Sequence, residues 1–231
     1  KMLELIFFVI AKMFYTVRLL AGMNIVAHFM LEKRKYFLCG VGANAVVLVL
    51  GGAFAFWSDK ILHLPFQMVQ VIYGSHYVGI SLLILLIVFI SYRGNGNAFL
   101  FVYMLGYALE CVVHGFSKFF VEAKIVEDGM TSPLGVCING IIFFIVYGGV
   151  YVLFRKTYKR GIRLAVGQGK GLTLFLCAVI FLLIYLRFEL LLLRSMAFDK
   201  TYAWGIDFML FVIPLLFLWS MMREVWVKKL N

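Results

Sequence analysis

Charged residues are scarce in this sequence. They make up 14% of the 231 residues, whereas hydrophobic residues make up 64% and the mean hydropathy is +1.00. Soluble domains have about 25% charged and about 45–50% apolar residues. A water-soluble fold of this length could not bury so much apolar surface. The scarcity of charge therefore excludes a soluble globular domain and predicts an integral membrane protein.

Proline is also rare, with three residues, and the long apolar runs show no strand-like alternation. This excludes an outer-membrane barrel, whose strands are alternating segments of about 9–11 residues. We expect an all-α polytopic bundle that forms one domain over 1–222. An α-helix needs about 20 apolar residues to cross a bilayer. The runs that meet this length are 3–30, 37–57, 69–92, 98–121, 133–154, 171–193 and 202–222.

The basic residues that remain are unevenly placed between these seven segments. With the sides of the connections alternating, 13 Lys and Arg fall on one side and six on the other. Lys and Arg concentrate in cytoplasmic loops, so this predicts an outside N-terminus and a cytoplasmic C-terminus. The same rule explains the net charge of +11 without nucleic acid as a partner. The first segment is the most polar, because it contains Lys12 and Arg18. It could therefore lie in the plane of the membrane interface instead of crossing the bilayer.

Sequence motifs of enzymes and cofactor sites are missing. The four cysteines have no metal-ligand spacing, and no HExxH or Ser/His/Asp set occurs. GVGANA at 40–45 follows no strand and indicates close helix packing instead of dinucleotide binding. GQGKG at 167–171 lacks the first glycine and the Ser or Thr of a P-loop. We predict no catalytic residue, no metal and no cofactor.

Two ionisable residues stand inside the fourth segment, in GYALECVVHG at 106–115. Glu110 and His114 are four residues apart, so a helix places both on one face. An ionised side chain costs about 2.5–3.5 kcal/mol at the bilayer centre on insertion scales, and such residues therefore suggest function. We predict a ligand-binding or switch site here, with an interhelical hydrogen-bonded tie as the structural alternative.

Three further ionisable residues are expected in the outer half of the last two segments. Arg187 and Glu189 are two residues apart and do not face each other on a helix, so each needs another partner. Asp207 is one candidate for Arg187, whose alternative is to extend toward the outer interface. A membrane enzyme that uses Glu110, His114 and Asp207 is a third possibility that no metal spacing supports.

Uncharged polar residues also occur in or near the apolar segments. In a membrane bundle such side chains most often form hydrogen bonds between helices. We expect this of most members of the set Asn24, Asn44, Gln67, Gln70, Asn139 and Tyr147.

Three stretches resemble the membrane sensor region of bacterial GHKL-type sensor histidine kinases, of which peptide-pheromone receptor kinases are relatives. They are HFMLEKRKYF (28–37), ISYRGNGNAFLFVYMLGYALECVVHGFSKFF (90–120) and LFRKTYKR (153–160). The resemblance implies a multi-pass receptor of the bacterial cytoplasmic membrane, acting as a homodimer. It also implies an extracellular or membrane-borne ligand such as a peptide, a cytoplasmic kinase domain and a response regulator. No phosphoacceptor or ATP-binding segment follows Asn231, so the kinase domain is expected to be absent from this chain.

The segment 223–231 continues the last span with mixed charge and apolar residues, including Arg223 and Trp226. We expect it to begin a cytoplasmic signalling helix that transmits the output. The alternative function is a small-molecule transporter or permease subunit. Such folds contain helices broken near the midplane, and Gly148-Gly149 and Pro214 are the candidate breaks.

Overall fold

The computed structural model describes residues 2–122, 129, 131–157 and the single positions 178, 182, 209, 212 and 213. Five long helices and a two-stranded ribbon make up this part of the chain. In order they are α1 (Met2–Met30), β1 (Glu32–Lys33), α2 (Phe37–Leu62), α3 (Phe66–Ser91), β2 (Tyr92–Arg93), α4 (Gly96–Glu122) and α5 (Pro133–Thr157). The prediction of an all-helical bundle is therefore confirmed except for the short ribbon.

All five helices are long and apolar enough to cross a membrane. Their positions confirm the first five predicted segments, although most of the helices extend a few residues further. Helix α1 is one continuous helix of 29 residues. The expected break at Gly148-Gly149 is wrong, because α5 continues through both glycines. The predicted sixth and seventh spans, Pro214 and residues 223–231 lie outside the described residues, apart from the single positions.

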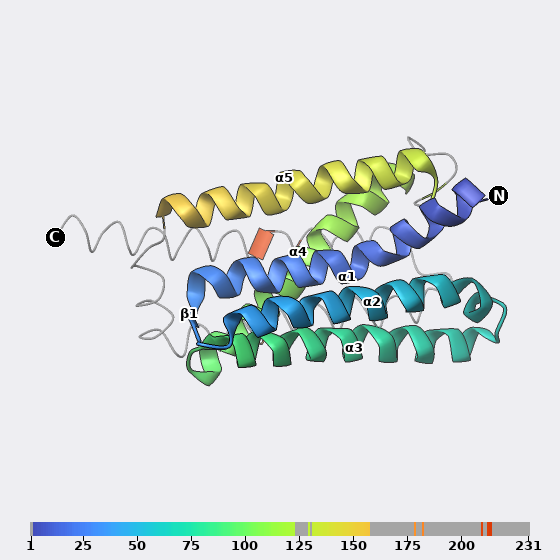
Figure 1. Cartoon of the computed structure of the whole chain (residues 1–231). Coiled ribbons are helices and arrows are strands. Elements are labelled where there is room, and N and C mark those ends of the chain that lie inside the picture. Colours follow the sequence, from blue (N-terminus) through green and yellow to red (C-terminus); the bar gives the residue numbers. More distant parts are fainter. Residues whose placement is uncertain are drawn as a thin grey trace.

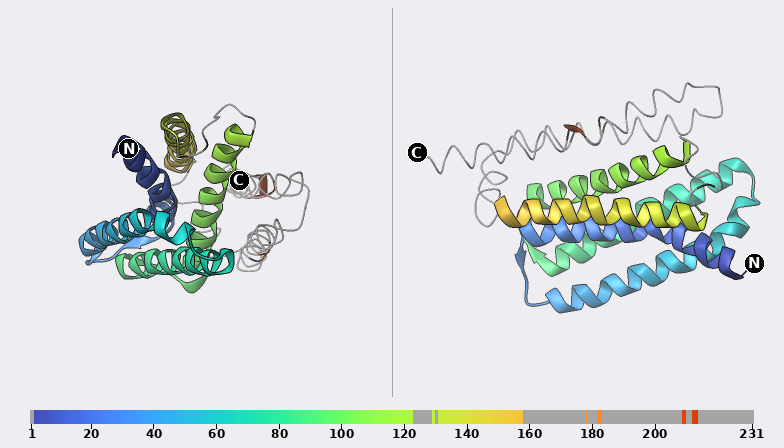
Figure 2. Two further views of the ribbon diagram at one scale, coloured as in Figure 1. Left: turned by 90° about the vertical axis from the view of Figure 1, so that its right-hand side faces the viewer. Right: turned by 90° about the horizontal axis from the view of Figure 1, so that it is seen from above.

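Helix α4 is the most buried of the five described helices. Figure 1 shows α1, α2, α3 and α5 along one common direction, with α4 crossing behind them at a tilt, and Figure 2 shows the same tilt from the end. In the most apolar 18-residue stretch of α4, 67% of the residues are buried, whereas in the corresponding stretches of the other four helices the share is 28% or less. Helix α1 contacts each of the other four helices. Polar residues where α1 meets α4 therefore face protein and not lipid.

Two glycines set the distance between α1 and α4. A Cβ atom on Gly22 would lie 2.9 Å from the carbonyl oxygen of Gly106, and one on Gly106 would lie 2.9 Å from the backbone nitrogen of Met23. The two backbones are therefore in direct contact, as at the small-residue crossings of membrane helices. Gly40 of the GVGANA stretch packs against the side chain of Ser91, which confirms close helix packing there, whereas Gly42 has no neighbour within 4 Å.

The ribbon joins the α1–α2 and α3–α4 connections at one end of the bundle. Its strands pair antiparallel, with Glu32 opposite Arg93 and Lys33 opposite Tyr92. The backbone N–H of Arg34 donates to the carbonyl of Ser91 at 2.9 Å and extends this pairing by one residue. The ribbon was not predicted, because two-residue strands produce no detectable alternation in a sequence.

Candidate functional site: a buried polar cluster

The polar cluster begins with Arg18, near the middle of α1. At about 1.5 Å per residue, Arg18 lies about 24 Å from the start of the helix and about 18 Å from its end. The residue is buried, with a relative exposure of 3%. A guanidinium stays charged at any accessible pH, so a full positive charge lies deep inside the bundle.

Glu110 of α4 supplies the matching negative charge. Its Oε1 accepts a hydrogen bond from Arg18 Nη2 at 2.9 Å, and both side chains are almost fully buried. The two glycines explain this geometry, since Gly22 is one turn after Arg18 and Gly106 one turn before Glu110. In an antiparallel pair of helices, backbone contact at the glycines brings the next two side chains together.

Asn139 of α5 adds a third helix to the cluster. Its Oδ1 accepts hydrogen bonds from Arg18 Nη1 at 3.0 Å and from Ser117 of α4 at 3.0 Å. The single hydroxyl proton of Ser117 is shared between this oxygen and the carbonyl of Val113 in its own helix. The amide oxygen of Asn139 is thus shared between α1 and α4, and all three polar residues are buried.

His114 lies on the same face of α4, one turn after Glu110. Its Nδ1 is 3.5 Å from Arg18 Nη2. Because a guanidinium can only donate hydrogen bonds, this contact is a hydrogen bond when the ring is neutral and carries its proton on Nε2. Arg18 therefore contacts three polar side chains through its two terminal nitrogens, while its Nε is buried without a hydrogen-bond partner.

Tyr147 of α5 contacts the backbone of Arg18. Its hydroxyl donates to the carbonyl of Arg18 at 2.7 Å, and its ring packs against Gly22. Helix α5 thus holds both the side chain and the main chain of α1 at this position. The cluster ties α1, α4 and α5 together, while α2 and α3 contribute no hydrogen bond to Arg18 in the part of the chain described.

Aromatic side chains continue from the cluster toward the N-terminal end of α1. The Tyr15 ring packs against that of Tyr77 of α3 at a tilt of 39°, with ring centroids 4.1 Å apart, and its hydroxyl donates to the Tyr77 carbonyl at 3.4 Å. One helical turn before Tyr15, the ammonium of Lys12 lies 5.4 Å from the ring of Tyr73 and 5.5 Å from that of Phe8. Ring faces can stabilise this cation inside the span. Both basic residues of the first segment thus have partners, which explains why so polar a segment forms a continuous helix.

Glu110 and His114 are the two predicted site residues that the structure describes, and both belong to the cluster. Arg187, Glu189, Asp207, Arg223 and Trp226 lie outside the described residues. Sequence reasoning missed Arg18 as the partner of Glu110, although two opposite charges inside apolar segments were a usable signal. The prediction that Asn139 and Tyr147 form interhelical hydrogen bonds is confirmed, as is that for Asn24 and Asn44, which join α1 and α2 at 3.4 Å.

The cluster combines opposite charges with hydrogen bonds. Among the described residues, no group of three or more His, Cys, Asp or Glu is placed to hold a metal ion. Comparison with protein-family models, characterised proteins and solved structures gives no match. The function must therefore be inferred from the residues themselves.

Proposed function

We propose that the chain is the transmembrane sensor module of a two-component signalling histidine kinase in a bacterial cytoplasmic membrane. The buried cluster of Arg18, Glu110, His114 and Asn139 is the observation that carries this proposal. Ionisable residues deep in a membrane bundle are costly, and a purely structural protein has little need of them. Together with the resemblance to GHKL-type sensors, the cluster supports a receptor whose helices change their arrangement.

The cluster has the properties of a two-state element. A buried ion pair has a narrow optimum in distance, so a small movement of α4 relative to α1 weakens several hydrogen bonds together. A ligand can shift such an equilibrium only as far as its affinities for the two arrangements differ. An extracellular or membrane-borne ligand, such as a peptide, that binds the helices at the end opposite the ribbon would have this effect if it favoured one position of α4.

The distribution of charge supports the orientation of the module. The ribbon and the C-terminal end of α5 lie at the same end of the bundle (Figure 1). Among the described residues, six basic positions gather there with one acid, Glu32: Lys33, Arg34, Lys35, Arg93, Arg155 and Lys156. The positive-inside rule favours this end as the cytoplasmic one. The kinase domain and its response regulator would then act on this side, in a homodimer of the receptor.

A fusion experiment tests the proposal without knowledge of the ligand. Residues 1–231 would be joined to a characterised histidine kinase core, and autophosphorylation would be measured in membranes. Because breaking the ion pair mimics a shift in the equilibrium, Glu110→Gln should raise or lower the basal rate severalfold. Asn44→Ala, which removes a polar contact outside the cluster, serves as the matched control and should leave the rate unchanged.

An unchanged rate of autophosphorylation would contradict the proposal. If autophosphorylation is the same for the wild-type fusion and Glu110→Gln, and a broad panel of peptides and lipophilic molecules also has no effect, the sensor assignment is wrong. Substrate uptake by proteoliposomes that contain the chain would then support a transporter instead. The continuous α5, which lacks the expected break at its glycine pair, argues against that alternative.

A further inference from the structure

The ribbon end of the bundle has the features of a site for acidic headgroups. We propose that it binds the phosphate groups of anionic phospholipids, with Arg34 and Arg93 as the principal contacts. This inference does not depend on a role in signalling. It depends only on this end of the bundle facing a leaflet that contains anionic lipid.

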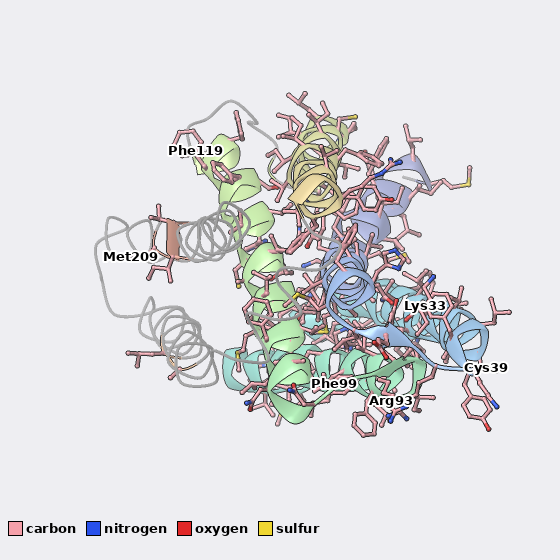
Figure 3. All side chains as sticks on the ribbon, turned by 90° about the vertical axis from the view of Figure 1, so that its left-hand side faces the viewer. Lys33, Cys39, Arg93, Phe99, Phe119 and Met209 are labelled. Atoms are coloured by element: carbon pink, nitrogen blue, oxygen red, sulfur yellow. The ribbon has the colours of Figure 1, made fainter. Side chains whose placement is uncertain are left out.

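The first observation is that the ribbon fixes the positions of the basic residues. Glu32 and Arg93 are opposite each other in the antiparallel pair, and so are Lys33 and Tyr92. Residues opposite each other share one side of the ribbon. Tyr92 is buried at 2% exposure, whereas Arg93 beside it and both residues of β1 are exposed. Figure 3 views the bundle from this end, with Lys33 and Arg93 labelled.

The second observation is that aromatic rings lie beside the cationic groups. The guanidinium of Arg34 lies 5.3 Å from the centre of the Phe89 ring, and the ammonium of Lys33 lies 4.3 Å from that of Phe37. Phe89 is half exposed near the end of α3, where it would face lipid. A cation over such a ring stands where hydrocarbon ends and phosphate begins.

The third observation is the balance of charge at this end. Arg34, Lys35 and Arg93 are exposed at the ribbon, and Glu32 is the single acid among the described residues there. Glu32 opposes Arg93 in register and offsets one positive charge, which leaves an excess of cations. Clusters of basic residues next to a membrane helix attract anionic lipids, by about 1 kcal/mol or about fivefold in affinity for each residue.

The other end of the bundle provides a matched control. Lys60 on the last turn of α2 is also exposed, and its ammonium lies 4.7 Å from the Trp57 ring. It therefore has the same combination of cation and aromatic ring as Arg34, but no ribbon and no further basic cluster beside it among the described residues. Loss of Lys60 tests whether any interfacial cation would give the same result.

The experiment uses the full chain in nanodiscs of phosphatidylcholine, with or without phosphatidylglycerol. Lipids that remain bound after transfer to detergent are identified by native mass spectrometry. We expect the wild-type chain to retain phosphatidylglycerol in preference to phosphatidylcholine. The double variant Arg34→Gln/Arg93→Gln should lower this preference by about 25-fold at low salt, whereas Lys60→Gln should leave it within about twofold of the wild type.

Folding is checked separately, by helix content and monodispersity in phosphatidylcholine alone, where all three proteins should be the same. An unchanged preference in a folded double variant would overturn the proposal, as would an equal loss in Lys60→Gln. Competition by glycerol 3-phosphate at the same phosphate concentration would also overturn it, because the site would then bind soluble phosphate and not the lipid. If the double variant cannot be folded, the single variants Arg34→Lys and Arg34→Gln decide the question, since only the second should lose the preference.

Discussion

Removing one partner of the Arg18–Glu110 ion pair should destabilise the bundle far more than removing both. At a separation of about 4 Å between charges and an effective dielectric constant of about 20, the attraction is about 4 kcal/mol. Truncating one member of a buried pair leaves an uncompensated charge and costs about 3–5 kcal/mol, whereas apolar replacement of the whole pair is often neutral. The variants are Arg18→Met, Glu110→Leu and the double variant.

The assay is a double-mutant cycle on the free energy of unfolding, measured by denaturant titration in mixed micelles or bicelles. We expect each single variant to lose about 3–5 kcal/mol and the double variant to recover most of that loss. This corresponds to a coupling energy of about 3 kcal/mol or more.

The neutral pair of Asn24 and Asn44, which also joins α1 to a neighbour, is the control for this cycle. Hydrogen bonds between membrane helices average about 0.6 kcal/mol in such cycles, so Asn24→Ala and Asn44→Ala should couple by less than about 1 kcal/mol. A coupling energy for Arg18 and Glu110 as small as that of the asparagines would refute a strong buried ion pair. The cluster would then be a set of ordinary polar contacts.

Three further predictions concern the packing around the cluster and the ribbon. Gly106→Ala should destabilise the bundle by several kcal/mol, because the new methyl group meets the Met23 backbone. Gly148 has no neighbour within 4 Å, so Gly148→Ala should be neutral or stabilising by up to about 1 kcal/mol in the same titration. Tyr147→Phe should cost about 0.5–1.5 kcal/mol, the value of one hydrogen bond, and a loss above about 3 kcal/mol would indicate a larger role in packing. Burial raises the pKa of Tyr92, which lies outside the spans, to about 12. Its contribution to stability should therefore be complete below pH 10 and lost as the pH rises from about 10 to 12. Tyr92→Phe should abolish this part of the pH dependence, and identical pH profiles of stability for the two proteins would contradict the prediction.

The number and position of the described helices could be predicted because hydrocarbon imposes a strict length rule on apolar segments. The same rule identified Glu110 and His114, since ionisable residues are conspicuous in an apolar sequence. Arg18 was harder to interpret, because a charge in an isolated segment is equally consistent with a surface helix. Its assignment required the contact between Gly22 and Gly106, and which glycines meet across a bundle depends on tertiary packing that no single segment encodes.

The ribbon illustrates a second limit of sequence reasoning. Two whole helices separate Glu32 from Arg93, and nothing in either connection indicates that these residues pair. Glu32 and Arg93 pair because α1 and α3 end at the same end of the bundle. The short connections that follow these two helices therefore lie side by side before α2 and α4 begin. The sequence reveals the charges of such turns but not their register.

The glycine contact between α1 and α4 also has a mechanical consequence. Two helices whose backbones touch at one crossing point can tilt about that point relative to each other. From Gly106 to the end of α4 at Glu122 the lever is about 24 Å long. A rotation of only about 5° about this crossing point would therefore displace the tip of α4 by about 2 Å, while the backbones at the pivot would hardly move.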